Sequence, residues 1–280
     1  MRKLWYFILL IILLLSLYLV FTGYQSRLSE HKLNRVQGEL FISDYLGYVC
    51  GFVNETVRLD VYWMTLNKND FSGAIGVRNL PDFVKVDKIE FHRTVFFEDP
   101  RLKEQTIQIY LKLMKPGIYR LENAYLEIYR SRENKTIKLP LGHIVFEILE
   151  RKNIPMLEIK RFMIGFITPY RNISPEYRFT IYNPTSKNVL LRNITISVPG
   201  LRIVKITCSK DCFSPIPPDG EKNITIIMQL ETPSKLYIIK PKIEYQVGSN
   251  TYYMPSKPYY LVVIPNAEEI KKIIVNNQAS

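Results

Sequence analysis

The stretch Thr106-Ile-Gln-Ile-Tyr-Leu-Lys-Leu-Met114 decides the class of fold, because apolar and polar side chains alternate along its length. Val57–Leu66 and Ala124–Tyr129 alternate in the same way. A two-residue period places one face of an extended strand against a core and the other face in water. Turn residues separate these runs, as in Lys115-Pro116-Gly117. The three segments therefore predict half-buried antiparallel strands.

The composition of the 280-residue chain favours strands over helices. Alanine, the best helix former, occurs four times, whereas aromatic residues make up 12% of the chain. Twelve glycines exclude a collagen-like repeat. Three histidines and three cysteines exclude a multi-histidine metal cluster and a disulfide-dense scaffold. We therefore expect an all-β protein.

The first 24 residues predict a transmembrane helix that acts as an uncleaved signal anchor. Leu4–Phe21 has no charged residue, and as a helix it would rise about 27 Å, close to the thickness of a bilayer core. Arg2 and Lys3 favour a cytoplasmic N-terminus, which places the bulk of the chain outside the cytoplasm. The alternative is a cleaved signal peptide, although Phe21 and Gly23 would form a poor cleavage site.

The rest of the chain divides into a stalk, two β-sandwich domains and a tail. Residues 25–37 are polar and predict the stalk. The charged segment Glu150–Pro155 interrupts the strand patterns, so we place a boundary there, between a first domain at 38–150 and a second at 151–265. The second domain has about seven short strands in about 110 residues, which is typical of an immunoglobulin-like (Ig-like) sandwich.

Three segments of the second domain follow a recognisable order of strands and turns, namely Phe179–Leu190, Asn193–Gly200 and Asp219–Thr225. This order resembles the Ig-like β-sandwich domains of prokaryotic, especially archaeal, cell-surface proteins. The resemblance covers about residues 165–265. The resemblance implies that this domain is a binding or spacing module, and it identifies no catalytic residue in this chain.

The tail at 266–280 predicts a short helix over about residues 267–276. Asn266 and Glu269 have the spacing of a capping box. Ile270, Ile273 and Ile274 form one apolar edge. We expect this edge to pack on the second domain, with docking to a partner as the alternative.

No constellation of residues in the sequence predicts catalysis. His31, His92 and His143 lie far apart and have no metal-ligand spacing. The sequence contains no nucleophile elbow, phosphate-binding loop or dinucleotide fingerprint. We therefore expect no enzymatic activity, no catalytic or cofactor-binding residue, no metal site and no cofactor.

Cys208 and Cys212 are separated by three residues, a spacing typical neither of redox motifs nor of zinc knuckles. Outside the cytoplasm we expect them to form a disulfide that clips the turn between them. Cys50 then remains as a buried thiol, with intermolecular pairing as the alternative.

Five Asn-x-Ser/Thr sequons occur in the chain, which is more than chance predicts. Asn172 is a poor acceptor because Pro175 follows its Ser174. The remaining sequons are the glycosylation candidates: Asn54, Asn134, Asn193 and Asn223.

Most of the net charge of +12 lies in the second domain. Residues 151–265 contain 16 basic and 7 acidic side chains, a balance of +9, whereas residues 38–150 contain 15 and 16. This excess either only solvates the surface or binds an anionic partner, such as an envelope glycan or an acidic surface protein. Nucleic acid is not expected as a partner. Lys240 and Lys242 are the basic surface candidates, because alternation over 236–247 places them on a polar face.

These observations predict a single-pass, non-catalytic binding or scaffold protein of the cell envelope. It would lie in the cell membrane with a cytoplasmic N-terminus and an extracytoplasmic bulk. One alternative is an enzyme or accessory subunit acting on envelope glycans, with its site in the first domain. Another is a secreted adhesin, if the leader is cleaved.

Overall fold

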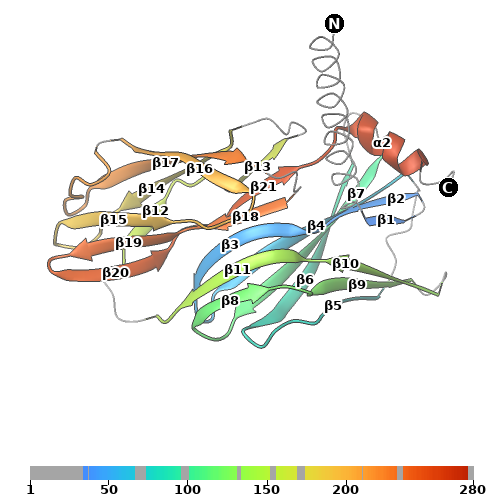
Figure 1. Ribbon diagram of the computed structural model, residues 1–280, viewed down its shortest axis with the longest axis horizontal. Helices are drawn as coiled ribbons and strands as arrows, with labels where there is room; N and C mark the ends of the chain where they lie inside the picture. The colour runs from blue at the N-terminus through green and yellow to red at the C-terminus, as the bar shows by residue number, and fades with distance from the viewer. Residues whose placement is uncertain are drawn as a thin grey trace, which may run out of the picture. The chain divides into compact units, whose positions relative to one another are not determined.

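The computed structural model describes residues 34–36, 38–66, 74–95, 101–130, 134–151, 156–168, 174–209, 211–231 and 236–276. The described elements are β-strands with one exception, the C-terminal helix α2 (Ala267–Asn276; Figure 1). The described part of the chain is therefore nearly all β, as its alternating segments predicted. The described residues from Arg35 onward form one compact unit.

The predicted transmembrane helix at Leu4–Phe21 and most of the predicted stalk lie outside the described residues. Within the described ranges, no helix is both long enough and apolar enough to cross a bilayer. The last part of the predicted stalk is not a loop, because Asn34–Val36 form strand β1 at the edge of a sheet.

The first sandwich has two layers of strands. One layer is a sheet in the order β1-β2-β4-β7-β6, at Asn34–Val36, Glu39–Ile42, Thr56–Thr65, Lys103–Leu113 and Val84–Val95. The other layer contains β10, β9 and β5 in one sheet, at Lys135–Pro140, Tyr125–Arg130 and Ala74–Arg78. It also contains β3, β11 and β8, at Tyr45–Phe52, Gly142–Leu149 and Gly117–Leu121. In the core between the layers, the ring centroids of Phe83 and Phe146 lie 5.7 Å apart.

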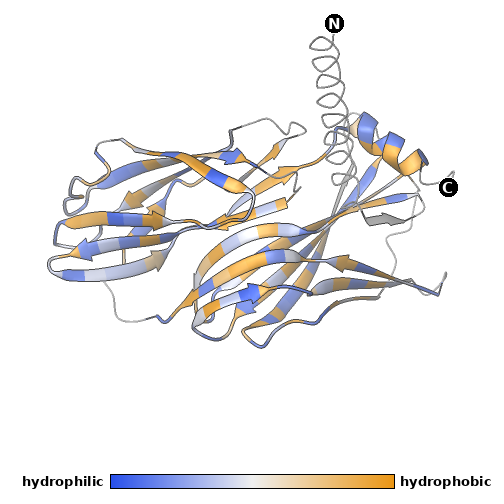
Figure 2. Ribbon diagram, in the orientation of Figure 1, coloured by the Kyte–Doolittle hydropathy of each residue, from blue (hydrophilic) through white to orange (hydrophobic). Residues whose placement is uncertain are grey.

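The alternation in the sequence determines which face each strand buries. Along β7, Ile107, Ile109 and Leu111 are fully buried, whereas Gln108 and Tyr110 between them stay partly exposed. Figure 2 shows this alternation of hydrophobic and hydrophilic segments along many of the strands. The prediction from residues 106–114 is therefore confirmed.

The second sandwich contains a four-stranded and a three-stranded sheet. The four-stranded sheet has the order β12-β14-β17-β16, at Glu158–Lys160, Glu176–Tyr182, Glu221–Leu230 and Leu201–Cys208. The three-stranded sheet has the order β15-β19-β20, at Val189–Thr195, Lys242–Val247 and Asn250–Pro255. Lettered A to G in chain order, these strands give A-B-E-D and C-F-G, the arrangement of the Ig constant-type fold. The Ig-like sandwich predicted for this segment is therefore present.

The first sandwich repeats this plan strand for strand, which the sequence did not predict. β2, β4, β7 and β6 take the places A-B-E-D, and β5, β9 and β10 take the places C-F-G. In both sandwiches an extra strand follows strand A, and we call it A′. It is β3 in the first sandwich and β13 (Gly165–Thr168) in the second.

The surroundings of A′ are also repeated. In each sandwich A′ pairs parallel with the continuation of strand G, which is β11 in the first and β21 (Tyr259–Val263) in the second. That continuation pairs antiparallel with the strand that precedes F, which is β8 in the first and β18 (Leu236–Lys240) in the second. Apart from β1, which pairs with β2 and has no counterpart in the second sandwich, the two sandwiches therefore share the same set of strand pairings.

One six-stranded sheet joins the two sandwiches, in the order β13-β21-β18-β3-β11-β8. Its central joint is the parallel pairing of β3 with β18, from Tyr45 opposite Leu236 to Val49 opposite Lys240. The predicted boundary between residues 150 and 151 therefore does not separate the sheets, because strand A′ of the first sandwich adds to a sheet of the second. Tyr48, Cys50 and Phe52 of β3 also belong to the buried apolar cluster of the second sandwich.

Helix α2 forms where the tail predicted a helix. The Oδ1 atom of Asn266 accepts a hydrogen bond from the backbone N–H of Glu269 at 3.0 Å, and the Glu269 carboxylate accepts one from the Asn266 N–H at 3.3 Å. These two bonds are the predicted capping box. Ile270 and Ile274 are buried, and the helix contacts β2. The helix therefore packs on its own chain, but against a strand of the first sandwich, where we had expected the second.

Candidate functional site

The joint between β3 and β18 contains a buried ion pair. Lys240, the last residue of β18, is only 2% exposed and donates a hydrogen bond to the carboxylate of Glu55 in the turn between β3 and β4. The other oxygen of Glu55 accepts the backbone N–H of Phe52 at 2.9 Å. Burial lowers the pKa of Lys240, whereas Glu55 acts in the opposite direction. Glu55 therefore makes a charged lysine tolerable inside the joint.

A second ion pair lies near the same joint. The ammonium group of Lys242 on β19 lies 2.6 Å from Oε1 of Glu147 on β11. The hydroxyl of Tyr48 on β3 donates to Oε2 of the same carboxylate at 2.6 Å. Burial and this hydrogen bond both raise the pKa of Tyr48, so its hydroxyl remains a donor. The pair therefore links strands of both sandwiches through side chains.

These contacts correct the prediction that Lys240 and Lys242 form an exposed basic surface. The prediction treated residues 236–247 as one continuous strand with a single polar face. Pro241 instead separates β18 from β19, and the two strands belong to different sheets. All five residues of β18 are buried, because it lies in the middle of the six-stranded sheet. The missed partners are Glu55 and Glu147, and Pro241 was the signal in the sequence that a central strand ends there.

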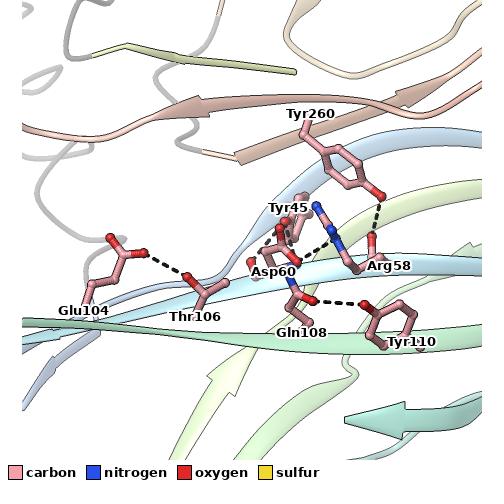
Figure 3. Close-up of polar contacts among 8 residues, drawn as sticks. All are labelled: Tyr45, Arg58, Asp60, Glu104, Thr106, Gln108, Tyr110 and Tyr260. Carbon is pink, nitrogen blue, oxygen red and sulfur yellow. Dashed lines mark hydrogen bonds and ion pairs between the residues drawn. The ribbon is translucent and has the colours of Figure 1, made fainter. Parts of the chain in front are cut away.

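A third polar cluster lies where β21 meets β4 (Figure 3). The Arg58 guanidinium forms an ion pair with Asp60 at 3.0 Å and lies 5.3 Å from the ring centroid of Tyr260. The Tyr260 hydroxyl donates to the backbone carbonyl of Arg58 at 3.0 Å. The Tyr45 hydroxyl donates to the Asp60 carbonyl at 3.0 Å and accepts the Asp60 N–H at 2.9 Å. Burial raises the pKa of the Asp60 carboxyl, and Arg58 opposes that shift.

A cavity of about 500 Å³ lies beside the Lys240–Glu55 pair. It is lined by the β3–β4 turn at 52–55, by Arg151, by residues 156–159 and by residues 254–257. A second cavity, of about 350 Å³, shares Glu55 and Lys257 with it. The lining of both cavities offers carboxylate, guanidinium and ammonium groups to a ligand. Neither lining contains a histidine or a cysteine, so the lining residues provide no Ser-His or Cys-His pair.

The histidines of the described chain lie on separate strands. His92 is on β6 and His143 is on β11, while His31 lies outside the described residues. Within the part of the chain that the structure describes, no three His, Cys, Asp or Glu side chains converge on a point where they could hold a metal ion.

The cysteines follow the arrangement expected from their spacing. Cys208 and Cys212 form a disulfide at the end of β16, and Cys50 is a free, buried thiol. Burial raises the pKa of Cys50 to about 12, which keeps it protonated at neutral pH. The disulfide belongs to the connection between strands D and E of the second sandwich.

The sequon asparagines lie on the surface, as attachment of a glycan requires. Asn54, Asn134, Asn193 and Asn223 are all exposed, whereas Asn172 lies outside the described residues. Asn54 and Asn134 have positive φ values of 70° and 48°, which places both in turns.

The strand pairings define the chain as a tandem Ig-like β-sandwich protein. No protein-family model matches this chain, and no curated protein sequence matches it. A protein of unknown function from Porphyromonas gingivalis W83 is 12% identical, with a TM-score of 0.27, over 81% of this chain and 100% of that one.

Two further solved structures have low scores as well. The I-band fragment I67–I69 from titin is 10% identical, with a TM-score of 0.20, and the match spans 82% of this chain and 66% of that fragment. Cadherin-like domains 1 to 4 of zebrafish RET are 8% identical, with a TM-score of 0.25, and the match spans 79% of this chain and 52% of that one. The class of fold therefore rests on the strand pairings.

Proposed function

We propose that this protein is a non-catalytic scaffold or binding protein of the cell envelope. The observation that carries the proposal is the β3–β18 pairing, which makes two Ig-like sandwiches one continuous unit. Domains linked only by a flexible segment move independently. Two sandwiches that share a sheet, a core and buried ion pairs keep a constant geometry, which suits a protein that holds partners at a set spacing.

Three features support a location outside the cytoplasm. A disulfide such as Cys208–Cys212 persists in an oxidising compartment. The four sequons on the described surface are accessible to glycosylation. The uncharged run at Leu4–Phe21, preceded by Arg2 and Lys3, suits a single-pass anchor with a cytoplasmic N-terminus.

Protease accessibility tests this topology. Protease added to intact spheroplasts should digest epitopes placed between residues 38 and 280, and the full-length protein should fractionate with membranes after a carbonate wash. A cytoplasmic marker protein must stay intact in the same sample. Protection of those epitopes until the membrane is permeabilised would refute the orientation. Release of a shorter soluble protein would instead indicate a secreted protein with a cleaved leader.

The charge of the second sandwich supports an anionic envelope partner as part of the proposal. Lys240 and Lys242 are no longer candidates for this contact, because both form ion pairs near the joint. The exposed basic side chains of the second sandwich include Lys187, Arg202 and Lys205. Lys187 and Lys205 have no ion pair with a described residue, so both charges are available. Retention of an envelope extract on the full-length protein should fall steeply as salt rises, and should fall further in Lys187→Glu with Lys205→Glu. Lys85→Glu, an exposed change in the first sandwich, is the control. Retention that changes neither with salt nor with the double substitution would refute the proposal of an anionic partner.

A further inference from the structure

The hairpin of β9 and β10 brings a sequon and an exposed tyrosine together in the first sandwich. The two strands lie side by side in antiparallel register, and β10 is an edge strand of its three-stranded sheet (Figure 1). The register places Thr136 directly opposite Tyr129. Asn134 lies immediately before β10 and begins the sequon Asn134-Lys135-Thr136. The acceptor asparagine, the threonine of its sequon and an aromatic ring therefore lie at one end of one hairpin.

Tyr129 contacts the acceptor asparagine directly. Its hydroxyl donates a hydrogen bond to Oδ1 of Asn134 at 3.2 Å. Asn134 has a φ of 48°, in the left-handed region that asparagine adopts more readily than most residues. Nδ2, the atom that receives the sugar in N-glycosylation, is bonded to the same carbon as this Oδ1. A sugar on Asn134 would therefore begin beside the Tyr129 ring.

The surroundings of the Tyr129 ring leave room for a sugar. The side chain is 41% exposed, and Thr136 beside it is exposed as well. The diagonal neighbour of Tyr129 on β5 is Gly76, which has no side chain to cover the ring. A Cβ atom added at Gly76 would come no closer than 3.8 Å to the Arg78 guanidinium, its nearest neighbour beyond the adjacent residues. The outer face of the sheet is therefore open next to the ring.

We propose that Asn134 carries an N-linked glycan whose first sugar stacks on the ring of Tyr129. This inference rests on the proposed location outside the cytoplasm, where sequons of this kind are modified. One face of a pyranose ring presents C–H groups, so the sugar and the tyrosine ring can remove apolar surface from water together. The contact joins β9 to the start of β10 through the sugar.

Attachment of the glycan requires a lipid-linked oligosaccharide as donor and a transferase that uses it. Nδ2 of Asn134 forms a bond to C1 of the first sugar, and the bond between C1 and a phosphate oxygen of the lipid carrier breaks. The phosphate leaves with the bonding electrons, and Nδ2 gives one proton to a base of the transferase. Oδ1 is unchanged in this step, so it can still accept the hydroxyl of Tyr129.

The stacked sugar would also protect an open strand edge. β10 pairs with β9 on one side and is the last strand of its sheet on the other. An open edge can pair with another chain unless something blocks it. A sugar held at Asn134 by a covalent bond and at Tyr129 by contact would stand at the start of this edge and hinder such pairing.

Mass spectrometry of the protein purified from native membranes tests the attachment. The peptide that contains Asn134 should carry a glycan, and Thr136→Ala should remove it because this change destroys the sequon. The protease-accessibility experiment separates this inference from the proposed location. Accessible epitopes together with an unmodified Asn134 would overturn this inference alone. Protection of the epitopes until the membrane is permeabilised would overturn both.

Nuclear magnetic resonance of the full-length protein in detergent micelles tests the stack. Cells that attach N-acetylglucosamine to secreted proteins supply the glycan, and an endoglycosidase trims each glycan to this single sugar. Protons above the face of an aromatic ring resonate upfield, so the sugar on Asn134 should give upfield signals. Asn134→Gln removes the sugar and thereby assigns these signals. Tyr129→Leu should return them to the positions of an unstacked sugar. Tyr125→Leu, the matched control on the same face of β9, should not.

Thermal unfolding gives an independent measurement of the same contact. The trimmed glycoprotein is compared with the same sequence made without glycans in a bacterial periplasm. The sugars should raise the melting temperature of the wild type by about 2 °C more than that of Tyr129→Leu, and the effects of the other sequons cancel in this difference. Tyr125→Leu should keep the full rise. An occupied Asn134 whose sugar signals do not differ between the wild type and Tyr129→Leu would overturn the stack, and so would an equal rise in both proteins.

Discussion

The ammonium group of Lys240 lies against the carboxylate of Glu55, a residue 185 positions earlier in the chain. Lys240 ends a strand of the second sandwich, and Glu55 lies in a turn of the first. This ion pair therefore connects the two sandwiches through side chains at the β3–β18 joint.

Glu55→Gln should destabilise the protein, because it leaves the buried ammonium of Lys240 without a countercharge. We expect a loss of about 3 kcal/mol, at the low end for a broken buried pair because the Glu55 side chain is 34% exposed. Urea unfolding measures the free energy. The double variant Glu55→Gln with Lys240→Met should recover most of the loss, since it removes the buried charge. Equal stability of Glu55→Gln and the wild type would show that Lys240 does not need this carboxylate.

Gly47→Ala should weaken the joint between the sandwiches. A Cβ atom at Gly47 would lie 2.4 Å from Cγ2 of Ile238 and 2.9 Å from its carbonyl oxygen, so β3 and β18 would have to move apart. We expect a loss of about 2 kcal/mol or more and faster proteolysis of the folded protein. Gly248→Ala is the matched control, because it has a φ of 62° and no atom within 4 Å of the added Cβ. It should cost only about 1 kcal/mol of backbone strain.

The Cys208–Cys212 disulfide should contribute about 2 kcal/mol, because it closes a short loop. A reducing agent should therefore lower the unfolding free energy of the wild type by that amount. The variant with serine at both positions should start lower and show no response to the reducing agent. Cys50→Ala controls for the third thiol, since Cys50 is free and its loss should leave the response unchanged. An unfolding free energy of the wild type that does not change with the reducing agent would contradict the expected contribution.

Asp60→Asn should change how stability depends on pH. Burial raises the pKa of Asp60 in the folded protein above its ordinary value, so the folded state holds this proton more tightly than the unfolded state does. The contribution of Asp60 is therefore fully present below its unfolded pKa and is lost as pH rises through the folded pKa. The stability of Asp60→Asn relative to the wild type should consequently increase as pH rises above about 4, the ordinary pKa of an aspartate carboxyl group. Urea unfolding of both proteins at several pH values in this range measures the difference, and a constant or falling difference would contradict the assignment.

Local patterns in the sequence predicted the elements better than their pairing. The period of residues 106–114 identified β7 and its buried face, and the capping box at Asn266 identified α2. Cys208 and Cys212 are close in sequence, so their pairing required no knowledge of the fold. In each case the decisive residues lie within about ten positions of one another.

The joint could not be predicted in this way. The parallel pairing of β3 with β18 depends on the shapes of two separate sandwiches, and no local signal in Tyr45–Phe52 marks its distant partner. Lys240 shares a two-residue period with Lys242 and Glu244 of β19, so treating 236–247 as one strand placed it in water. Its burial follows from the neighbours on both sides of β18, which only the three-dimensional arrangement supplies.

The β3–β18 pairing also constrains how the protein can be made. β3 leaves the ribosome long before β18, since even Glu55 precedes Lys240 by 185 residues. At a synthesis rate of about 5 to 20 residues per second, this delay lasts about 10 to 40 s. During that time one side of β3 has no strand to pair with, and Tyr48, Cys50 and Phe52 lack the core that later covers them. The newly made chain therefore exposes an unpaired strand edge and these apolar side chains until β18, in the last sixth of the sequence, has been translated.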